Sequence, residues 1–142
     1  MKVICIGLCA AVALTACTTA PTSDAQMVQN ENDCAVIAAV AKEHYGFGAD
    51  GPYPVRFSDD YSPACDWGQY GLAFVTPDPV PPRDRENWPG WVSFSRPSYD
   101  SQGAVLDTDR VGGVFAGEGV RCRLRSGFAG WTVTDCELVW ES

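Results

Sequence analysis

The sequence GVRCRLR at residues 119–125 decides the fold of this chain. Apolar and basic residues alternate along it, so a strand here places Val120, Cys122 and Leu124 on one face and the three arginines on the other. A second run rich in apolar residues, 131–140, follows after a short turn that contains two glycines. Two such runs joined by a glycine-containing turn are typical of a β-hairpin with one buried face. The C-terminal region is therefore predicted to form a hairpin that packs on a core.

The register of this hairpin is predicted from its two cysteines. If Cys122 faces Cys136 directly, their separation suits a disulfide, whereas a slip of two residues moves them about 7 to 8 Å apart, which is too far. One conflict concerns the faces of the second strand, because Trp131 and Val133 share one face while Cys136 lies on the opposite one. Either a bulge near residues 134–135 reverses the alternation, or both faces are partly covered; we predict the bulge.

The segment before the hairpin predicts one helix and several strands. Asn and Asp residues just before Cys34 are N-cap candidates, and Val36, Ile37 and Val40 recur at helical spacing, so we expect a helix over about 33–45. Strands are predicted at 91–96 and 104–111, and short strands are open alternatives at 54–57 and 71–75. Together these elements predict an α+β domain in which an N-terminal helix packs on a twisted antiparallel sheet of four or five strands, in two layers.

The N-terminal residues have the pattern of an export signal. Lys2 precedes a continuous apolar run over residues 3–13, and small residues follow that run. The run is shorter than the roughly 20 apolar residues that span a bilayer, which argues against a transmembrane helix. The residues Leu14 to Cys17, LTAC, resemble the lipobox of bacterial lipoproteins, in which the cysteine is lipidated and becomes the first residue of the mature chain.

The resemblance to lipoproteins implies a membrane anchor and divides the chain. We expect a signal peptide at 1–16, a lipid on Cys17, a flexible tether over 17–30 and a single globular domain at 31–142. Lipoproteins of this type usually carry several acyl chains, so the lipid bilayer is an expected partner. In that family an Asp directly after the cysteine often retains the protein at the inner membrane. Thr18 stands there instead, which favours the outer membrane, with the domain in the periplasm or on the cell surface.

The remaining cysteines predict two disulfides. Two of the seven cysteines lie in the expected signal and Cys17 takes the lipid, so four remain in an exported domain. Four cysteines allow three pairings. The hairpin favours a bond between Cys122 and Cys136, and Cys34 then pairs with Cys65 by elimination. Closely spaced cysteines of the Cys-x-x-Cys kind, which a zinc site needs, are absent from the sequence, so no metal site is predicted.

The net charge limits the partners that composition allows. The chain carries 18 acidic and 10 basic side chains, which is a formal charge of −8 at pH 7. Loss of the signal removes Lys2 and no acidic residue, so the mature chain is more acidic still. An acidic surface repels nucleic acid and anionic lipid, so no nucleic-acid partner is expected.

The C-terminal third carries a second pattern. It consists of Phe-Ser-Arg-Pro at 94–97, Gly-x-Gly at 117–119, Trp-x-Val at 131–133 and Trp-x-Ser at 140–142. In this order the motifs look like a pattern in bacterial exported α+β domains of unassigned function. The resemblance implies a fold and carries no chemistry. The domains that it resembles lack the cysteine pair of the hairpin, so a disulfide here is a departure from their pattern.

Catalysis is the less favoured interpretation of the polar residues. His44 is the only histidine, and no Ser or Cys nucleophile can be paired with it from the sequence. At the end of the predicted helix it suits an ordinary last-turn residue. The carboxylates that could act in pairs as acid and base are Asp59, Asp60, Asp107, Asp109 and Glu118. Neighbouring carboxylates are expected by chance in so acidic a chain, so we assign no catalytic residue and no cofactor. A small envelope hydrolase that uses carboxylates is the alternative function.

Aromatic side chains around a proline-rich region carry the binding hypothesis. The region 76–90 contains five prolines and is expected to form an extended surface loop. Exposed aromatic residues on such a loop suit contact with a protein or a glycan, and the alternative is that they pack over the sheet as a small core. The candidate partner-binding residues are Tyr61, Trp67, Tyr70, Trp88 and Trp91. We therefore expect a non-catalytic, lipid-anchored envelope protein that binds an envelope protein or glycan, as an inhibitor or accessory subunit.

Overall fold

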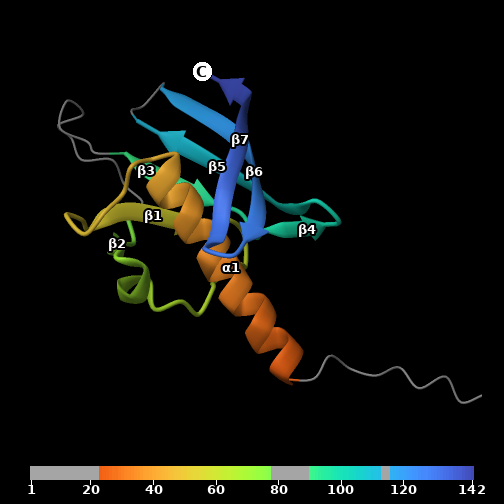
Figure 1. Cartoon of the computed structure of the whole chain (residues 1–142). Coiled ribbons are helices and arrows are strands. Elements are labelled where there is room, and N and C mark those ends of the chain that lie inside the picture. The colour runs from red at the N-terminus through yellow and green to blue at the C-terminus, as the bar shows by residue number, and fades with distance from the viewer. Residues whose placement is uncertain (1–22, 78–89, 113–115) are drawn as a thin grey trace, which may run out of the picture.

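The computed structural model of the chain (Figure 1) describes residues 23–77, 90–112 and 116–142. One helix, α1 (Ser23–Glu43), lies across one face of a twisted sheet, which confirms the α+β class. The signal peptide predicted at 1–16, the lipid on Cys17 and the role of Trp88 all fall outside the described residues. No helix in the described part of the chain is long and apolar enough to cross a membrane.

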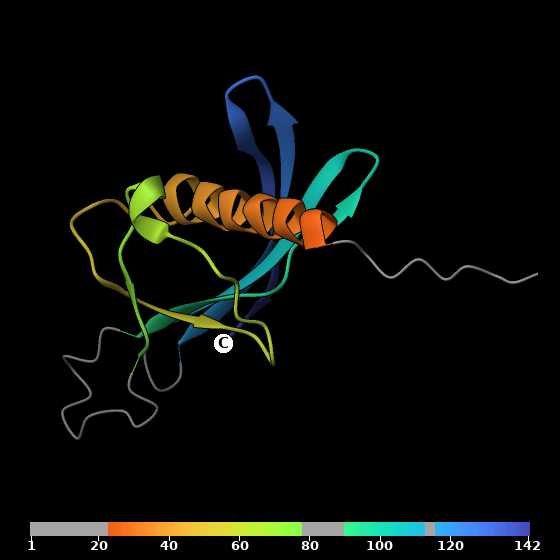
Figure 2. The ribbon, with the colours of Figure 1, turned by 90° about the horizontal axis from the view of Figure 1, so that it is seen from below.

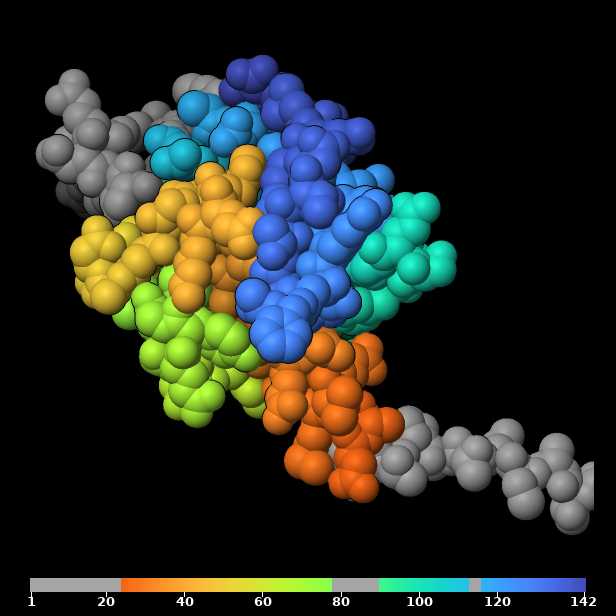
Figure 3. All heavy atoms as spheres, in the orientation of Figure 1, coloured from red at the N-terminus to blue at the C-terminus, as the bar shows by residue number. Residues whose placement is uncertain are grey.

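Helix α1 begins earlier than the sequence predicts, and its two halves differ in burial. It starts at Ser23, so the later part of the stretch 17–30 is helical rather than a tether, because its Ala, Gln and Met residues are strong helix formers. Residues 24–29 are exposed and project from the body of the domain (Figure 3), whereas 33–41 is buried on nearly all sides. The helix stops before Gly46, whose φ of 70° is left-handed and costs glycine little.

The sheet has seven strands among the described residues, more than the four or five predicted, and it is mixed rather than purely antiparallel. The strands are β1 (Tyr53–Phe57), β2 (Phe74–Val75), β3 (Trp91–Phe94), β4 (Ser98–Asp100), β5 (Gly103–Val111), β6 (Gly117–Gly127) and β7 (Gly130–Glu141). Their order is β2-β1-β3-β5-β6-β7, and β4 pairs with β5. β1 pairs in parallel with both β2 and β3. The predicted number of strands was too low because short segments pair with the sheet to satisfy their backbone hydrogen bonds. Alternation of side chains in the sequence does not reveal this pairing.

Strands β6 and β7 form the predicted hairpin in the predicted register. Cys122 lies directly opposite Cys136, and the two residues form a disulfide. The predicted bulge is also confirmed, because the pairing shifts at Thr134. Val133 and Cys136 therefore both pack against the core in spite of their odd spacing. The register thus agrees with the cysteine geometry and with the apolar pattern together.

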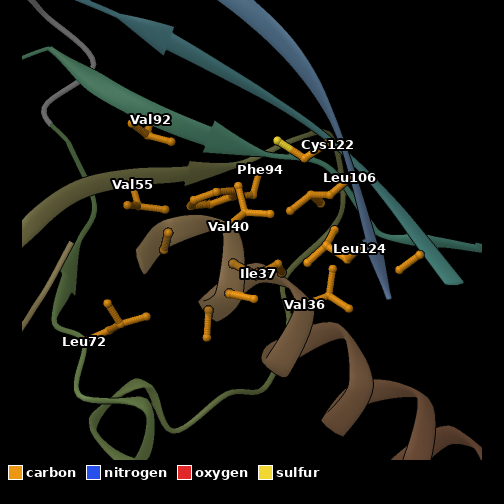
Figure 4. Packing of buried hydrophobic residues seen from close by; sticks show 14 of the residues in the cluster. Val36, Ile37, Val40, Val55, Leu72, Val92, Phe94, Leu106, Cys122 and Leu124 are labelled. Atoms are coloured by element: carbon orange, nitrogen blue, oxygen red, sulfur yellow. The ribbon is translucent and has the colours of Figure 1, made fainter. Parts of the chain in front are cut away.

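The core lies between α1 and the sheet (Figure 4). Val36, Ile37 and Val40 of the helix point toward the strands and are fully buried. The sheet contributes Val55, Val92, Phe94, Leu106, Cys122 and Leu124 to the same cluster. The alternation read from GVRCRLR is thereby confirmed, since its apolar side chains enter this core. Burial of these side chains is the main favourable contribution to folding.

The second disulfide joins Cys34 in α1 to Cys65, in the loop before the short 3-10 helix η1 (Trp67–Tyr70), as predicted by elimination. The Asn30 side chain reinforces it, because its Nδ2 donates to the carbonyl of Ala64 at 2.9 Å and its Oδ1 accepts from the N–H of Ala64 at 3.2 Å. These contacts hold the loop against the helix.

Candidate functional site

The aromatic residues predicted to bind a partner lie mostly within a packed cluster. Trp67 is half-buried, stacks on Phe57 with ring centroids 5.9 Å apart, and lies 4.8 Å from the ring of Phe74. Tyr70 is also half-buried, with its ring 6.3 Å from Trp67. Both residues pack against the buried core. This arrangement matches the alternative in which these aromatics form a small core of their own.

Tyr61 and Trp91 are likewise engaged by neighbouring side chains. The Tyr61 hydroxyl donates to Asp33 at 3.0 Å, and the guanidinium of Arg96 lies 4.9 Å from the centroid of its ring. Trp91 is half-buried, with the guanidinium of Arg56 4.2 Å from its ring centroid. The structure thus gives the four described aromatics packing roles, and a role in partner binding stays a prediction.

A groove elsewhere on the domain brings together side chains that suit a ligand. It lies where the β4–β5 turn and the β6–β7 hairpin stand beside the first half of α1 (Figure 2), and its volume is about 770 Å³. Among the residues lining it are Asn32, Tyr99, Asp100, Gln102, Arg125 and Trp131. They come from three parts of the chain that are distant in the sequence, so only folding assembles the groove.

This groove combines aromatic rings with hydrogen-bonding groups. The ring centroids of Tyr99 and Trp131 lie 5.9 Å apart, with their planes tilted by 56°. Tyr99 is 39% exposed, so its ring is accessible from the groove. The side-chain amides of Asn32 and Gln102 can both donate and accept, and the guanidinium of Arg125 adds further donors. Such a set suits a ligand that has an apolar face and several hydroxyl groups.

A buried carboxylate holds Tyr99 in place at the groove. Asp33 is only 5% exposed and accepts hydrogen bonds from the hydroxyls of Tyr99 at 2.6 Å and Tyr61 at 3.0 Å. Burial, and then the hydrogen bond to Asp33, raise the pKa of Tyr99, and the same two causes raise the pKa of Tyr61. Both hydroxyls therefore keep their protons and act as donors to the carboxylate.

Alkaline pH is expected to weaken the fold through these tyrosines. A group whose pKa is raised by folding stabilises the folded state fully below its unfolded pKa, about 10 for tyrosine, and loses that contribution as the pH rises toward the folded-state pKa. The free energy of unfolding should therefore fall as the pH rises above about 10. Tyr99→Phe removes one titrating hydroxyl, so urea unfolding at several pH values should show a shallower fall in the variant. Equal slopes in the two proteins would contradict this role.

The carboxylates considered for acid and base chemistry have structural partners. Asp107 forms an ion pair with Arg121 at 2.7 Å, and Asp109 accepts a hydrogen bond from an indole N–H of β7 at 2.9 Å. Residues 59–60 form a turn. Glu118 lies apart from that turn, near the start of β6. The two carboxylates of β5 thus help to hold the outer face of the sheet.

His44 has a neighbour that the sequence does not reveal. It directly follows α1, which ends at Glu43 rather than near the predicted residue 45, and its side chain is exposed. An imidazole nitrogen and the sulfur atoms of Cys122 and Cys136 all lie within 4.8 Å of one another. The single histidine therefore sits beside the hairpin disulfide.

Sequence reasoning missed the groove because each of its parts is ordinary when considered alone. Tyr99 next to Asp100, Gln102 and Gly103 has the composition of a turn, and Trp131 has that of a strand residue. Comparisons with models of protein families, with curated proteins and with solved structures find no match to this chain. The chemistry of the groove is therefore the guide to function.

Proposed function

We propose that this protein is a non-catalytic lipoprotein of the bacterial cell envelope that binds a glycan in the groove beside α1. The lipobox at residues 14–17 supports an anchor on Cys17, and Thr18 favours the outer membrane over the inner membrane. The two disulfides agree with an oxidising compartment outside the cytoplasm.

The aromatic pair beside amide groups is the observation that carries glycan binding. A sugar ring presents C–H groups that pack on aromatic faces such as those of Tyr99 and Trp131. Its hydroxyls would bond to the amides of Asn32 and Gln102, and Arg125 would favour a sugar that carries a carboxylate. The volume of about 770 Å³ lies within the usual range for small-ligand sites.

The carboxylate content of the groove favours binding without turnover. Among the described residues that line it, Asp100 is the one carboxylate, and Arg123 already pairs with it at 2.9 Å. Glycoside hydrolysis by the usual mechanisms needs two carboxyl groups, roughly 5 to 9.5 Å apart. A hydrolase is therefore the weaker candidate for this groove.

Replacing Trp131 is expected to remove most of the glycan affinity. The full chain, extracted from membranes in detergent, is titrated with soluble cell-wall glycan fragments in a calorimeter. Trp131→Ala should weaken binding at least tenfold, because the lost stacking and buried area together exceed about 1.4 kcal/mol. Phe128→Ala is the matched control, since Phe128 is an exposed aromatic residue in the turn of the same hairpin and does not line the groove.

The outcomes of this titration separate the alternatives. If Trp131→Ala binds the glycan as tightly as the wild type, the groove is not the binding site. If only Trp67→Ala loses binding, the site lies instead in the region around the proline-rich loop.

The mass of the same membrane-extracted protein tests the lipid anchor on Cys17. A chain that still begins at Met1 would contradict lipidation of Cys17.

A further inference from the structure

The hairpin disulfide differs from the other disulfide in having a histidine beside it. The chain has a single histidine, His44, and one of its imidazole nitrogens lies within 4.8 Å of both sulfur atoms of Cys122 and Cys136. His44 directly follows α1, while Cys122 lies in β6 and Cys136 in β7. Three separate elements thus converge on one point, and two of the three side chains are thiol-derived.

We propose that the reduced hairpin is a metal site, in which the thiolates of Cys122 and Cys136 and the imidazole of His44 bind one Zn(II)-like cation. Thiolate sulfur and imidazole nitrogen are the ligands that such cations prefer. This site goes beyond glycan binding and does not depend on it. Three protein ligands leave a fourth position open to water, as in zinc sites that are not purely structural.

The spacing of the ligands fits this coordination after small side-chain movements. In a tetrahedral zinc site two sulfurs lie roughly 3.8 Å apart, and sulfur and nitrogen roughly 3.6 Å apart. Cys122 and Cys136 face each other across the ladder with Cα atoms 4.1 Å apart, so rotation of the two side chains can separate the sulfurs while the strands keep their register. His44 is exposed and its one ring contact is with Tyr45, at 4.7 Å between centroids among the described residues, so its ring can turn toward the sulfurs over the remaining distance.

The disulfide and the metal site are alternative states of the same two sulfurs. A dithiol reductant supplies two electrons and two protons, the S–S bond breaks, two thiols form, and the reductant itself becomes a disulfide. The cation then displaces the two thiol protons to water as it binds. Cys136 is partly exposed whereas Cys122 is fully buried, so the reductant would attack at Cys136. Metal uptake would thus follow loss of oxidising conditions.

Titration of the reduced protein with Co(II) tests the proposal. The full chain in detergent is reduced with a phosphine and titrated without oxygen, and visible absorption reports tetrahedral thiolate coordination of Co(II). We expect one equivalent to bind after reduction and none before it, with displacement by Zn(II). His44→Ala should lower the affinity at least tenfold without changing the far-UV circular dichroism, because His44 is exposed. Cys34→Ser with Cys65→Ser should leave the uptake in place.

Three results would overturn the metal site. One is the absence of Co(II) uptake by the reduced wild-type protein. Another is an equal affinity for Co(II) in reduced His44→Ala and in the reduced wild type, because the thiols alone would then hold the cation. The third is uptake that survives Cys122→Ser with Cys136→Ser, since these residues supply two of the three ligands.

Discussion

Phe94→Ala should lower the free energy of unfolding by about 3 to 5 kcal/mol, the usual cost of truncating a fully buried phenylalanine. Phe94 is inaccessible to solvent and lies in the middle of the core on β3. Its ring centroid is 6.1 Å from that of Tyr45, 6.4 Å from Phe57 and 6.3 Å from Phe74. Truncation therefore removes aromatic contacts from both layers, and the cavity left behind is lined by a helix and a sheet that cannot easily close it.

Chemical unfolding followed by tryptophan fluorescence measures this loss. Phe128→Ala provides the matched control, because the same side chain is removed from a fully exposed position and should change stability by no more than about 0.5 kcal/mol. A domain of this size is expected to have only about 5 to 15 kcal/mol of stability, so Phe94→Ala should also lower the melting temperature clearly. A loss of less than about 1 kcal/mol would place Phe94 outside the core.

Removal of the disulfide between Cys34 and Cys65 is expected to have the second large effect. Changing both residues to Ala should cost about 3 to 4 kcal/mol, because the bond closes a loop with a sequence separation of 31 in the unfolded chain. In the folded state the bond ties the loop before η1 to the buried half of α1. The hydrogen bonds between Asn30 and Ala64 remain, and they hold the loop less firmly than a covalent link.

The hairpin disulfide is the matched comparison for this change. The separation between Cys122 and Cys136 is 14, for which loop closure alone predicts about 3 kcal/mol, or about 0.7 kcal/mol less than for the longer loop. The ladder between β6 and β7 also keeps these strands paired when the bond is absent. Chemical unfolding of both double variants without reductant shows which disulfide contributes more to the free energy of unfolding. A larger loss for the hairpin pair would show that loop length does not control these effects.

Local patterns account for the parts of the fold that the sequence predicts well. The alternation in GVRCRLR specifies a strand with one buried face, and Cys122 opposite Cys136 then leaves one register that satisfies the sulfur geometry. The bulge at Thr134 follows from the conflict between Val133 and Cys136. These inferences succeed because the interacting residues are close together in the chain, so their relation can be read from spacing.

Predictions that needed a distant partner were less complete. The parallel pairing of β1 with β3 joins segments separated by the proline-rich region. Strand β4 pairs with the nearby β5, but its three residues are all exposed, so no apolar alternation marks it in the sequence. The early start of α1 at Ser23 also departs from the expected start near Asp33, since the exposed residues 24–29, apolar and polar alike, form helix without a core to face. Apolar periodicity cannot report an element whose stability comes from propensity or from a neighbouring strand.

The sequence by itself determined the hairpin, its register and the buried half of the helix, and it favoured the pairing of the four cysteines that the structure shows. Only the tertiary structure decided where the aromatic residues went and which side chains share the groove. Trp67 and Tyr61 turned toward the core and toward Asp33, while Tyr99 and Trp131 came together beside Asn32. The reason is physical: periodicity and loop closure act between residues near in the chain, whereas a groove depends on how whole elements pack, and no local pattern encodes that packing.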